Sequence, residues 1–228
     1  REKLGKGIHI DVYFHHNNIQ VFENIISTVR GKYGMYVVAP IPNKKTASIL
    51  KTLPMERFLM IDRFEPMKGN FSYVTQEFED ASYNVFEQLL SRIRKYKKGM
   101  IYYHRPNSDT PVEILEAFKK FSDTYGIDHE ILPEYIPGSM EKGKVYYTIN
   151  NAELWMMLKD AKEKNFELGK QVGILSHNDD IVKEIICGGI TTYSTDFKLM
   201  AERAAQFVLT HEKTQQTIPT VLIKRKSL

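Results

Sequence analysis

Residues 176–180, Ser-His-Asn-Asp-Asp, place five adjacent hydrogen-bonding side chains directly after the apolar run 172–175. Hydroxyl, imidazole, amide and carboxylate groups at such a junction can cap the helix that follows. The same groups can also bind a ligand that carries many hydroxyl groups. Capping alone explains polar residues at any one strand-to-helix junction, so a single cluster does not identify a site.

The same pairing of an extended run with polar residues recurs at four other places. The predicted strands 8–14, 57–61, 99–103 and 145–149 are each followed by polar side chains. These side chains are His15, His16, Asn17 and Asn18; Asp62 and Arg63; His104, Arg105, Asn107, Ser108, Asp109 and Thr110; and Asn150 and Asn151. Because ligands of open α/β sheets bind beyond the carboxyl ends of the strands, this recurrence favours a ligand-binding cleft.

No motif in the sequence predicts catalysis or metal binding. His15 and His16 lack the i, i+4 spacing of a helical zinc pair, and no other His or Cys cluster has metal-ligand spacing. A G-x-S-x-G elbow, a Walker loop and a G-x-G-x-x-G motif are all absent from the sequence. Asp179 and Asp180 are neighbours, so they do not form a pair of carboxylates that face each other across a cleft. We therefore expect no catalytic residue, no metal and no cofactor.

Extended and helical patterns alternate along almost the whole chain. Further strands are predicted at 33–40, 73–76, 129–132, 172–175, 190–194 and 217–224, and helices at 19–32, 44–53, 80–96, 110–125, 152–164, 179–186 and 197–209. Strands that alternate with helices form right-handed βαβ units and parallel sheets. There are too many units for one small sheet, so we expect two sheets, with a crossing after Asp62.

The composition is that of an ordinary globular protein. Of the 228 residues, 42% are hydrophobic, and the net charge is +4. No apolar run approaches the roughly 18–20 residues that span a bilayer, and the basic residues are spread among acids, unlike those of a dedicated nucleic-acid binder. The single cysteine, Cys187, excludes an internal disulfide and suits a reducing compartment. Its apolar neighbours predict a small core residue rather than a nucleophile.

The last third of the chain resembles the effector-binding region of lactose- and galactose-repressor-type (LacI/GalR) transcription regulators. The resemblance rests on KQVGILSHND (170–179), GITTYSTDF (189–197), LMAERAAQFVL (199–209) and IPTVLIKRKSL (218–228). It looks closest to the bacterial subgroup in which this sensor follows a GntR-type winged-helix domain. Upstream, FLMIDR (58–63), YVTQEF (73–78) and ILEAF (114–118) fall at matching landmarks, so the resemblance covers essentially the whole chain.

The resemblance implies the type I periplasmic-binding-protein fold, an α/β fold of two Rossmann-like lobes joined by three crossings. The first lobe would comprise 1–63 and 196–216, and the second 64–195 and 217–228. The family's first strand, most of its first helix and its DNA-binding domain would precede Arg1, so we expect an incomplete first lobe. The stretch 133–143 is also too short for the helix that many relatives have there.

The resemblance also implies ligand contacts at the polar strand ends. Asp62 matches an acidic residue of the family's cleft, and Asn178 matches a cleft aspartate that is an amide here. Where the family often has an arginine, this chain has Ile114, so Arg63 or Arg105 is the expected replacement donor. With the remaining strand ends, the predicted ligand-binding set is His15, His16, Asn17, Asp62, Arg63, Arg105, Ser108, Thr110, Glu113, Tyr135, Asn150 and Asn178. Tyr135 is included because sugars pack on aromatic rings, although packing between the lobes would equally explain it.

The resemblance favours a cytoplasmic, homodimeric sensor that binds a small effector and controls DNA through a domain outside this chain. A neutral monosaccharide is the expected effector, because no dense basic cluster or glycine-rich nest follows a strand. Arg63 and Arg105 leave an acidic or phosphorylated sugar as an open alternative. The helix 19–32 and the region 44–53 are the expected dimer surfaces. Two alternatives remain open at the level of sequence: a secreted sugar-binding protein of a transport system, which shares the fold, and a sugar-modifying enzyme. The ending LIKRKSL favours the regulator.

Overall fold

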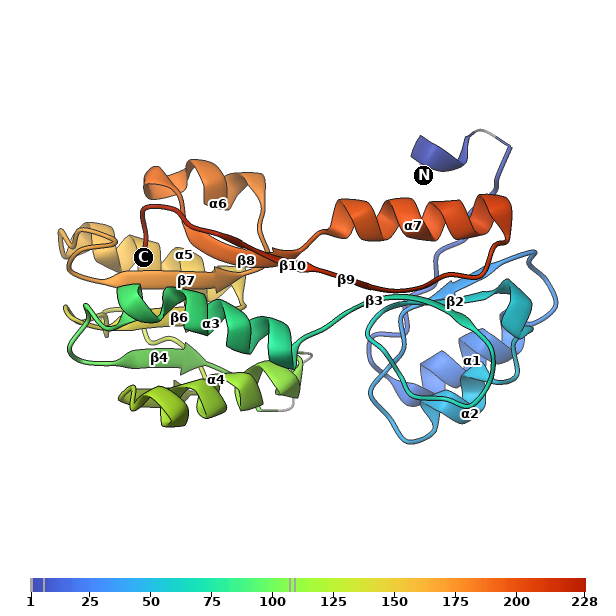
Figure 1. Cartoon of the computed structure of the whole chain (residues 1–228), viewed down its shortest axis with the longest axis horizontal. Helices are drawn as coiled ribbons and strands as arrows, with labels where there is room; N and C mark the ends of the chain where they lie inside the picture. The colour runs from blue at the N-terminus through green and yellow to red at the C-terminus, as the bar shows by residue number, and fades with distance from the viewer. Residues whose placement is uncertain (1, 6, 107, 109) are drawn as a thin grey trace. The chain divides into compact units, whose positions relative to one another are not determined.

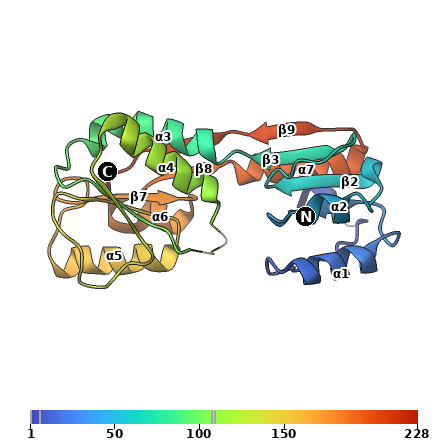
Figure 2. The ribbon, with the colours of Figure 1, turned by 90° about the horizontal axis from the view of Figure 1, so that it is seen from below.

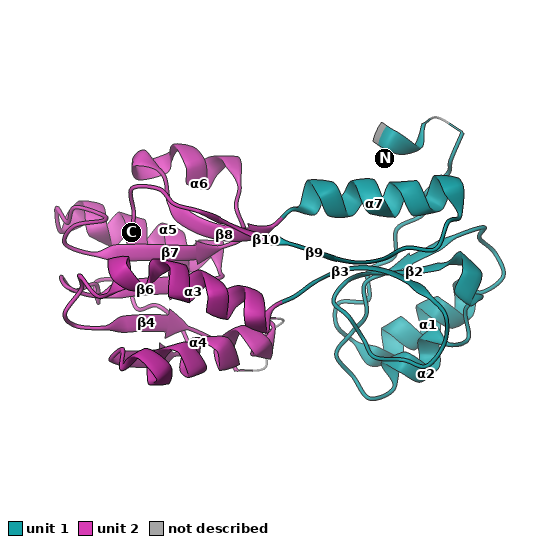
Figure 3. Ribbon diagram, viewed as in Figure 1, with its two compact units in different colours: residues 1–77, 196–219 teal, residues 78–195, 220–228 magenta. Residues whose placement is uncertain are grey.

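The computed structural model describes residues 2–5, 7–106, 108 and 110–228. The chain forms two compact units (Figure 3). Unit 1 comprises Arg1–Glu77 and Asp196–Pro219, and unit 2 comprises Phe78–Thr195 and Thr220–Leu228. The chain therefore passes from one unit to the other three times, after Glu77, after Thr195 and after Pro219.

Unit 1 is built on a four-stranded sheet whose pairings are all parallel. Its strands, in spatial order, are β1 (Tyr36–Val38), β2 (Phe58–Asp62), β3 (Ser72–Gln76) and β9 (Gln215–Ile218). Helices α1 (Ile19–Val29) and α2 (Thr46–Leu50) cover one face and α7 (Phe197–Thr210) the other (Figure 1). The alternation of side chains along β2 supplies both cores: Phe58 and Met60 pack towards α1 and α2, and Leu59 packs towards α7.

The strands β3 and β9 correct the predicted lobe boundaries. The sequence placed 64–77 in the second lobe, but β3 pairs with β2, with Thr75 opposite Asp62, so the crossing follows Glu77. The single strand predicted at 217–224 divides at Pro219 into β9 in unit 1 and β10 (Thr220–Ile223) in unit 2. A proline lacks the N–H that would continue a ladder, so a change of sheet at this residue is physically reasonable.

The strand predicted at 8–14 is wrong. These residues have no ladder partner in the described part of the chain, and Val12 and Phe14 are 67% and 70% exposed. Their side chains contact the segment before β1 instead, where the Tyr33 hydroxyl donates to Asp11 Oδ2 at 2.6 Å. A segment rich in β-branched residues forms a strand only where the edge of a sheet pairs with its backbone N–H and C=O groups.

Unit 2 contains a six-stranded sheet, parallel except where β10 runs antiparallel to β8. In spatial order the strands are β10, β8 (Thr191–Thr195), β7 (Gly173–His177), β6 (Val145–Thr148), β4 (Met100–Tyr103) and β5 (His129–Leu132). Figure 2 shows helices α3 (Glu79–Ile93) and α4 (Val112–Tyr125) on one face and α5 (Asn151–Glu163) on the other. The short helix α6 (Ile181–Ile185) follows β7.

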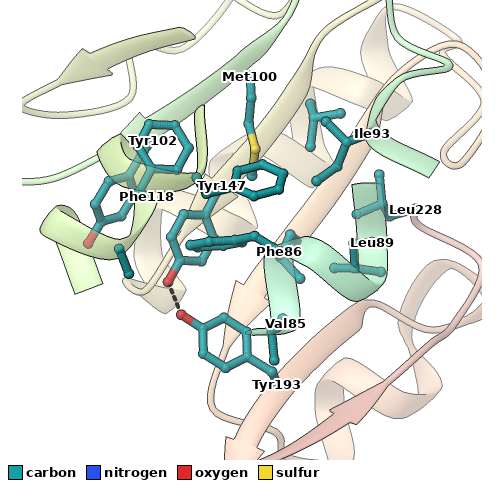
Figure 4. Packing of buried hydrophobic residues seen from close by; sticks show 14 of the residues in the cluster. Val85, Phe86, Leu89, Ile93, Met100, Tyr102, Phe118, Tyr147, Tyr193 and Leu228 are labelled. Atoms are coloured by element: carbon teal, nitrogen blue, oxygen red, sulfur yellow. Dashed lines mark hydrogen bonds between the residues drawn. The ribbon is translucent and has the colours of Figure 1, made fainter. Parts of the chain in front are cut away.

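Aromatic side chains dominate the core between this sheet and helices α3 and α4 (Figure 4). Phe86 of α3 packs edge-on against Tyr147 and Phe118, with ring centroids 5.4 and 6.0 Å away. Tyr102 stacks on Tyr147 at 4.6 Å. These rings are buried and bring together β4, β6, α3 and α4, so the strand ends of unit 2 rest on a closely packed support.

The connection from β5 to β6 contains no helix, as the short stretch 133–143 predicted. It packs Tyr135 and Met140 into the core on the α5 face. Asp160 of α5 ties this connection down, because its carboxylate accepts from the Tyr135 hydroxyl and the Gly138 N–H.

Candidate ligand-binding site

The carboxyl ends of three neighbouring strands in unit 2 lie side by side. The register places Tyr103 of β4 opposite Thr148 of β6, and Thr148 opposite Ser176 of β7. The residues that follow these strands, His104, Asn150 and Asn178, therefore leave the same edge of the sheet. This edge is where ligands of parallel α/β sheets bind.

Asn178 holds a backbone conformation that few residues adopt. Its φ is +58°, its N–H donates to the Tyr193 oxygen at 2.9 Å, and its own oxygen accepts from Lys183 Nζ at 2.6 Å. The side-chain Oδ1 is buried and has no hydrogen-bond partner among the described residues. Unpaired buried polar atoms are rare in proteins, so this amide is a candidate for a functional role.

The other polar residues of this stretch have structural partners. Asp180 caps α6 by accepting from the Lys183 N–H at 2.9 Å. Asp179 accepts two hydrogen bonds from Arg225, at 2.6 and 2.9 Å, and one from Thr192. The Arg225 hydrogen bonds hold the pKa of Asp179 below its ordinary value. Capping and ion pairing thus account for the aspartates but leave Asn178 unexplained.

His177 precedes Asn178 and was not in the predicted ligand set. The side chain is buried, its Nδ1 has no partner among the described residues, and its ring lies edge-on to Tyr193 at 4.6 Å. Burial, followed by the Lys183 ammonium, lowers the pKa of His177 to about 4, so the imidazole is neutral at pH 7. Its only signal in the sequence was its place within the polar run.

A chain of hydroxyl groups lies behind His177. The Tyr193 hydroxyl pairs with the Tyr147 hydroxyl, as Figure 4 shows, and with Ser82 Oγ at 3.0 Å. Both tyrosines are buried, and burial raises the pKa of each well above the ordinary range. These two tyrosine hydroxyl groups are therefore uncharged at neutral pH.

The strand ends of β6 and β4 carry less distinctive groups. Asn150 is exposed and caps α5, with its Oδ1 accepting from the Ala152 N–H at 2.8 Å. His104 is half-buried, and burial, with a smaller effect of Lys119, lowers its pKa. Either side chain can contact a ligand, but helix capping fully explains Asn150.

The residues that follow His104 spread over the surface. Arg105 is exposed and pairs with Glu134 at 3.2 Å. Ser108 is exposed, Thr110 is half-buried, and Glu113 lies half-buried in the first turn of α4. Asn107 and Asp109 lie outside the described residues. The structure therefore does not bring the described residues of this part of the predicted set together at one place.

Tyr135 corrects the prediction of a ring that stacks on the ligand. It is 3% exposed, lies edge-on to Tyr103 and Tyr146, and donates its hydroxyl to Asp160. The connection between β5 and β6 lacks a helix, so a large side chain fills the space against α5. Tyr135 therefore packs within the core of unit 2.

Cys187 also differs from its predicted role as a small core residue. The thiol is exposed, and the residue has a φ of +53° in the turn that follows α6. Its apolar neighbour Ile185 is 71% exposed. The apolar run was read as core, but α6 is too short to bury both of its faces.

In unit 1, Asp62 is the best placed of the predicted residues. It ends β2 with a φ of +74°, it is half-buried, and its Oδ1 accepts from Gln76 Nε2 at the end of β3. Arg63 follows and is half-buried. Asp62 and Asn178 thus share a feature, because each ends a parallel strand in the left-handed conformation.

His15, His16 and Asn17 do not follow a strand, since 8–14 is not one. They form the turn before α1, in which His15 Nδ1 accepts from the Asn17 N–H at 3.1 Å. Asn18 is the cap of α1 and accepts from the Gln20 and Val21 N–H groups. The helix cap explains this polar run, and the structure places it at no strand end.

A cavity of about 290 Å³ in unit 2 lies at the opposite, amino-terminal ends of the strands. It is lined by Arg92, Lys95, Tyr96, Gly169, Arg225, Lys226 and Leu228. Arg225 is bound to Asp179, and Arg92 donates to the Leu228 oxygen. These contacts leave mainly two exposed lysines, so we do not take this cavity as the candidate site.

Nowhere among the described residues do three or more His, Cys, Asp or Glu side chains gather in a way that could hold a metal ion. No helix of this part of the chain combines the length and the apolar character that crossing a membrane requires.

Neither protein-family models nor curated protein sequences match this chain. Solved structures do. A LacI family transcriptional regulator from Silicibacter pomeroyi superposes over 97% of this chain and 88% of its own, with a TM-score of 0.77 and 16% identity. A LacI family regulator from Lactobacillus casei with bound sucrose superposes over 97% of this chain and 89% of its own, with a TM-score of 0.77 and 11% identity. A LacI family regulator from Enterococcus faecium with bound ribose superposes over 92% of this chain and 83% of its own, with a TM-score of 0.67 and 15% identity.

These likenesses define the class of fold. The chain has the α/β fold of LacI-type transcription regulators, with parallel sheets flanked by helices, and the predicted fold class is confirmed. At identities below 25% the likeness establishes the fold alone. The closer resemblance to GntR-type regulators stays a prediction.

Proposed function

We propose that this chain is the ligand-sensing and dimerisation domain of a bacterial transcription regulator. In this proposal it catalyses no reaction and binds a small, sugar-like effector at the strand ends of both units. It then controls, in the cytoplasm, a DNA-binding domain that lies outside this chain. An effector that prefers one arrangement of the units shifts their population, and that shift is the signal.

One observation carries the proposal. Asp62 in unit 1 and Asn178 in unit 2 each end a parallel strand with φ above +50° and present a carboxylate or an amide there. Residues held in this sparsely populated conformation cluster at functional sites. Carboxylate and amide groups are suited to hydroxyl groups, and the sugars bound in two regulators of this fold are in keeping with such a ligand.

A thermal-shift screen tests the proposal. The purified chain is heated with neutral pentoses and hexoses, with sugar phosphates and with sugar acids. A ligand present at about 100 times its Kd stabilises the folded state by roughly 2.7 kcal/mol, so we expect a rise in Tm with at least one neutral monosaccharide. Product analysis of the same mixtures checks for turnover, which would contradict a role in binding alone.

A rise with none of these compounds, repeated on a longer chain that includes the preceding residues, would remove the case for a sugar sensor. Binding to DNA is tested separately with that longer chain, because the sensor is proposed to act on a domain outside the residues described above.

A further inference from the structure

Lys183 lies buried beneath the carboxyl end of β7. It is 1% exposed, and its Nζ donates to the main-chain oxygens of His177 and Asn178 at 2.8 and 2.6 Å. Within the part of the chain that the structure describes, it forms no ion pair with a carboxylate. Burial lowers the pKa of Lys183, and the more distant charges of Asp180 and Asp179 act in the opposite direction.

A buried ammonium group is costly unless it is hydrogen-bonded. An apolar side chain would fill the same space without that cost, so packing alone does not explain the lysine. What the lysine supplies is two strong donors for two consecutive carbonyl groups. These carbonyls lie where β7 ends, and the His177 oxygen also accepts from Ser176 Oγ at 3.4 Å.

The contact with Lys183 defines the local backbone. Asn178 has a φ of +58°, which is unfavourable for residues other than glycine and is tolerated best by Asn and Asp. The ammonium turns both carbonyls towards the interior, and the Asn178 N–H is held by the Tyr193 oxygen. With the backbone held on both sides, the direction of the Asn178 Cα–Cβ bond is set.

We propose that Lys183 is the positioning residue of the candidate site, whose ammonium group fixes the turn that presents Asn178 to the effector. The inference rests on the proposed function for the identity of the ligand, but not for the backbone geometry. Lys183 does not touch the effector in this account. It acts through the backbone of Asn178, and its charge adds to burial, the larger cause, in lowering the pKa of the neighbouring His177.

The test replaces Lys183 with methionine, which has a similar length and no charge. Lys159→Met, at an exposed position of α5, is the matched control. In Lys183→Met we expect Asn178 to leave the left-handed region, seen in its three-bond HN–Hα coupling and Cα shift. The pKa of His177, followed by the NMR signals of its ring, should rise. The Kd for the effector found in the thermal-shift screen should increase about tenfold or more. All three quantities should stay unchanged in the control.

A folded Lys183→Met protein with unchanged Asn178 coupling and unchanged His177 pKa would overturn the inference, even if the wild-type protein binds a sugar. If the wild-type protein binds none, the proposed function fails, while the coupling and the pKa still decide whether Lys183 positions the turn. If Lys183→Met does not fold, Lys183→Gln replaces it, because glutamine keeps two N–H donors without the charge. An unchanged His177 pKa in that variant would overturn the inference.

Discussion

At the scale of single residues, the Asp179–Arg225 pair shows how the strand end is anchored. The two side chains are 20% and 14% exposed, and the guanidinium donates through two nitrogens to both carboxylate oxygens. Such charge-assisted, two-point pairs are stronger than ordinary hydrogen bonds. The pair joins the residue after Asn178 to the residues after β10, so it ties the candidate site to the edge of the sheet.

We expect Asp179→Asn to lower the free energy of unfolding by roughly 2 kcal/mol at neutral pH, the scale of a charge-assisted hydrogen bond that is partly buried. Because the pKa of Asp179 is lowered in the folded state, its contribution is present above the ordinary value of 3.8. It is lost as the pH falls through the folded value. Urea denaturation at several pH values should therefore show a difference from wild type that shrinks below about pH 4.

The exposed pair Lys159–Glu163, 3.8 Å apart, provides the control. Glu163→Gln should change stability by less than about 0.5 kcal/mol. Equal losses in the two variants would contradict the role given to Asp179.

Gly99 and Gly31 differ in how much space surrounds a glycine with positive φ. Both have positive φ, +81° and +79°, but a Cβ on Gly99 would lie 2.1 Å from the Asp128 oxygen, whereas one on Gly31 would meet nothing within 4 Å. Gly31→Ala should therefore cost only about 1–2 kcal/mol of stability, from the left-handed conformation. Gly99→Ala should cost clearly more, because the start of β4 must shift. Similar midpoints in urea for both variants would contradict this reading.

At the scale of elements, local pattern predicted most helices and strands well where the sheet could accept them. The helix predicted at 152–164 is α5 (Asn151–Glu163), because an asparagine cap and apolar periodicity agree there. The pattern at 8–14 has equal strand character and fails, since pairing depends on a neighbouring edge that local sequence does not encode. Tyr135 fails as a ligand contact for the same reason: its burial is set by a connection whose path depends on the whole sheet.

The candidate site was predicted in part. The recurrence of polar strand ends pointed to Asp62 and Asn178, whose surroundings support a functional role, while His15–Asn17 form the turn before α1. His177 and Lys183 were missed, because the significance of each lies in burial and in contacts that no spacing in the sequence reveals. A lysine three residues after Asp180 looks like any surface lysine of a short helix.

The connection between β5 and β6 gives a prediction at this scale. Asp160 is 4% exposed and holds the connection through Tyr135 and Gly138. In Asp160→Ala we expect residues 133–144 to exchange their amide hydrogens faster, while α5 keeps its protection, because the helix retains its own hydrogen bonds. Hydrogen exchange followed by mass spectrometry measures both segments. Lys159→Ala serves as control, and unchanged exchange at 133–144 in Asp160→Ala would show that Asp160 does not hold the connection.

At the scale of the whole molecule, the proposed function needs both units to contribute to the binding of one ligand. Each unit has its own sheet, its own cores and one strand end with an acidic or amide side chain in the left-handed conformation. A ligand held by one unit alone would have no means of favouring one arrangement of the units over another. The proposed signal therefore depends on contacts from both units.

Calorimetric titration of two glycine variants shows whether side chains of both units contact the effector. Asp62→Gly and Asn178→Gly remove one side chain from each unit while glycine accepts the positive φ. The controls, His211→Gly in unit 1 and Asn165→Gly in unit 2, make the same change at φ of +58° and +52° away from the strand ends. We predict that each site variant weakens the binding of the effector about tenfold or more, and that neither control does. Full affinity in either site variant would contradict a ligand shared by the two units.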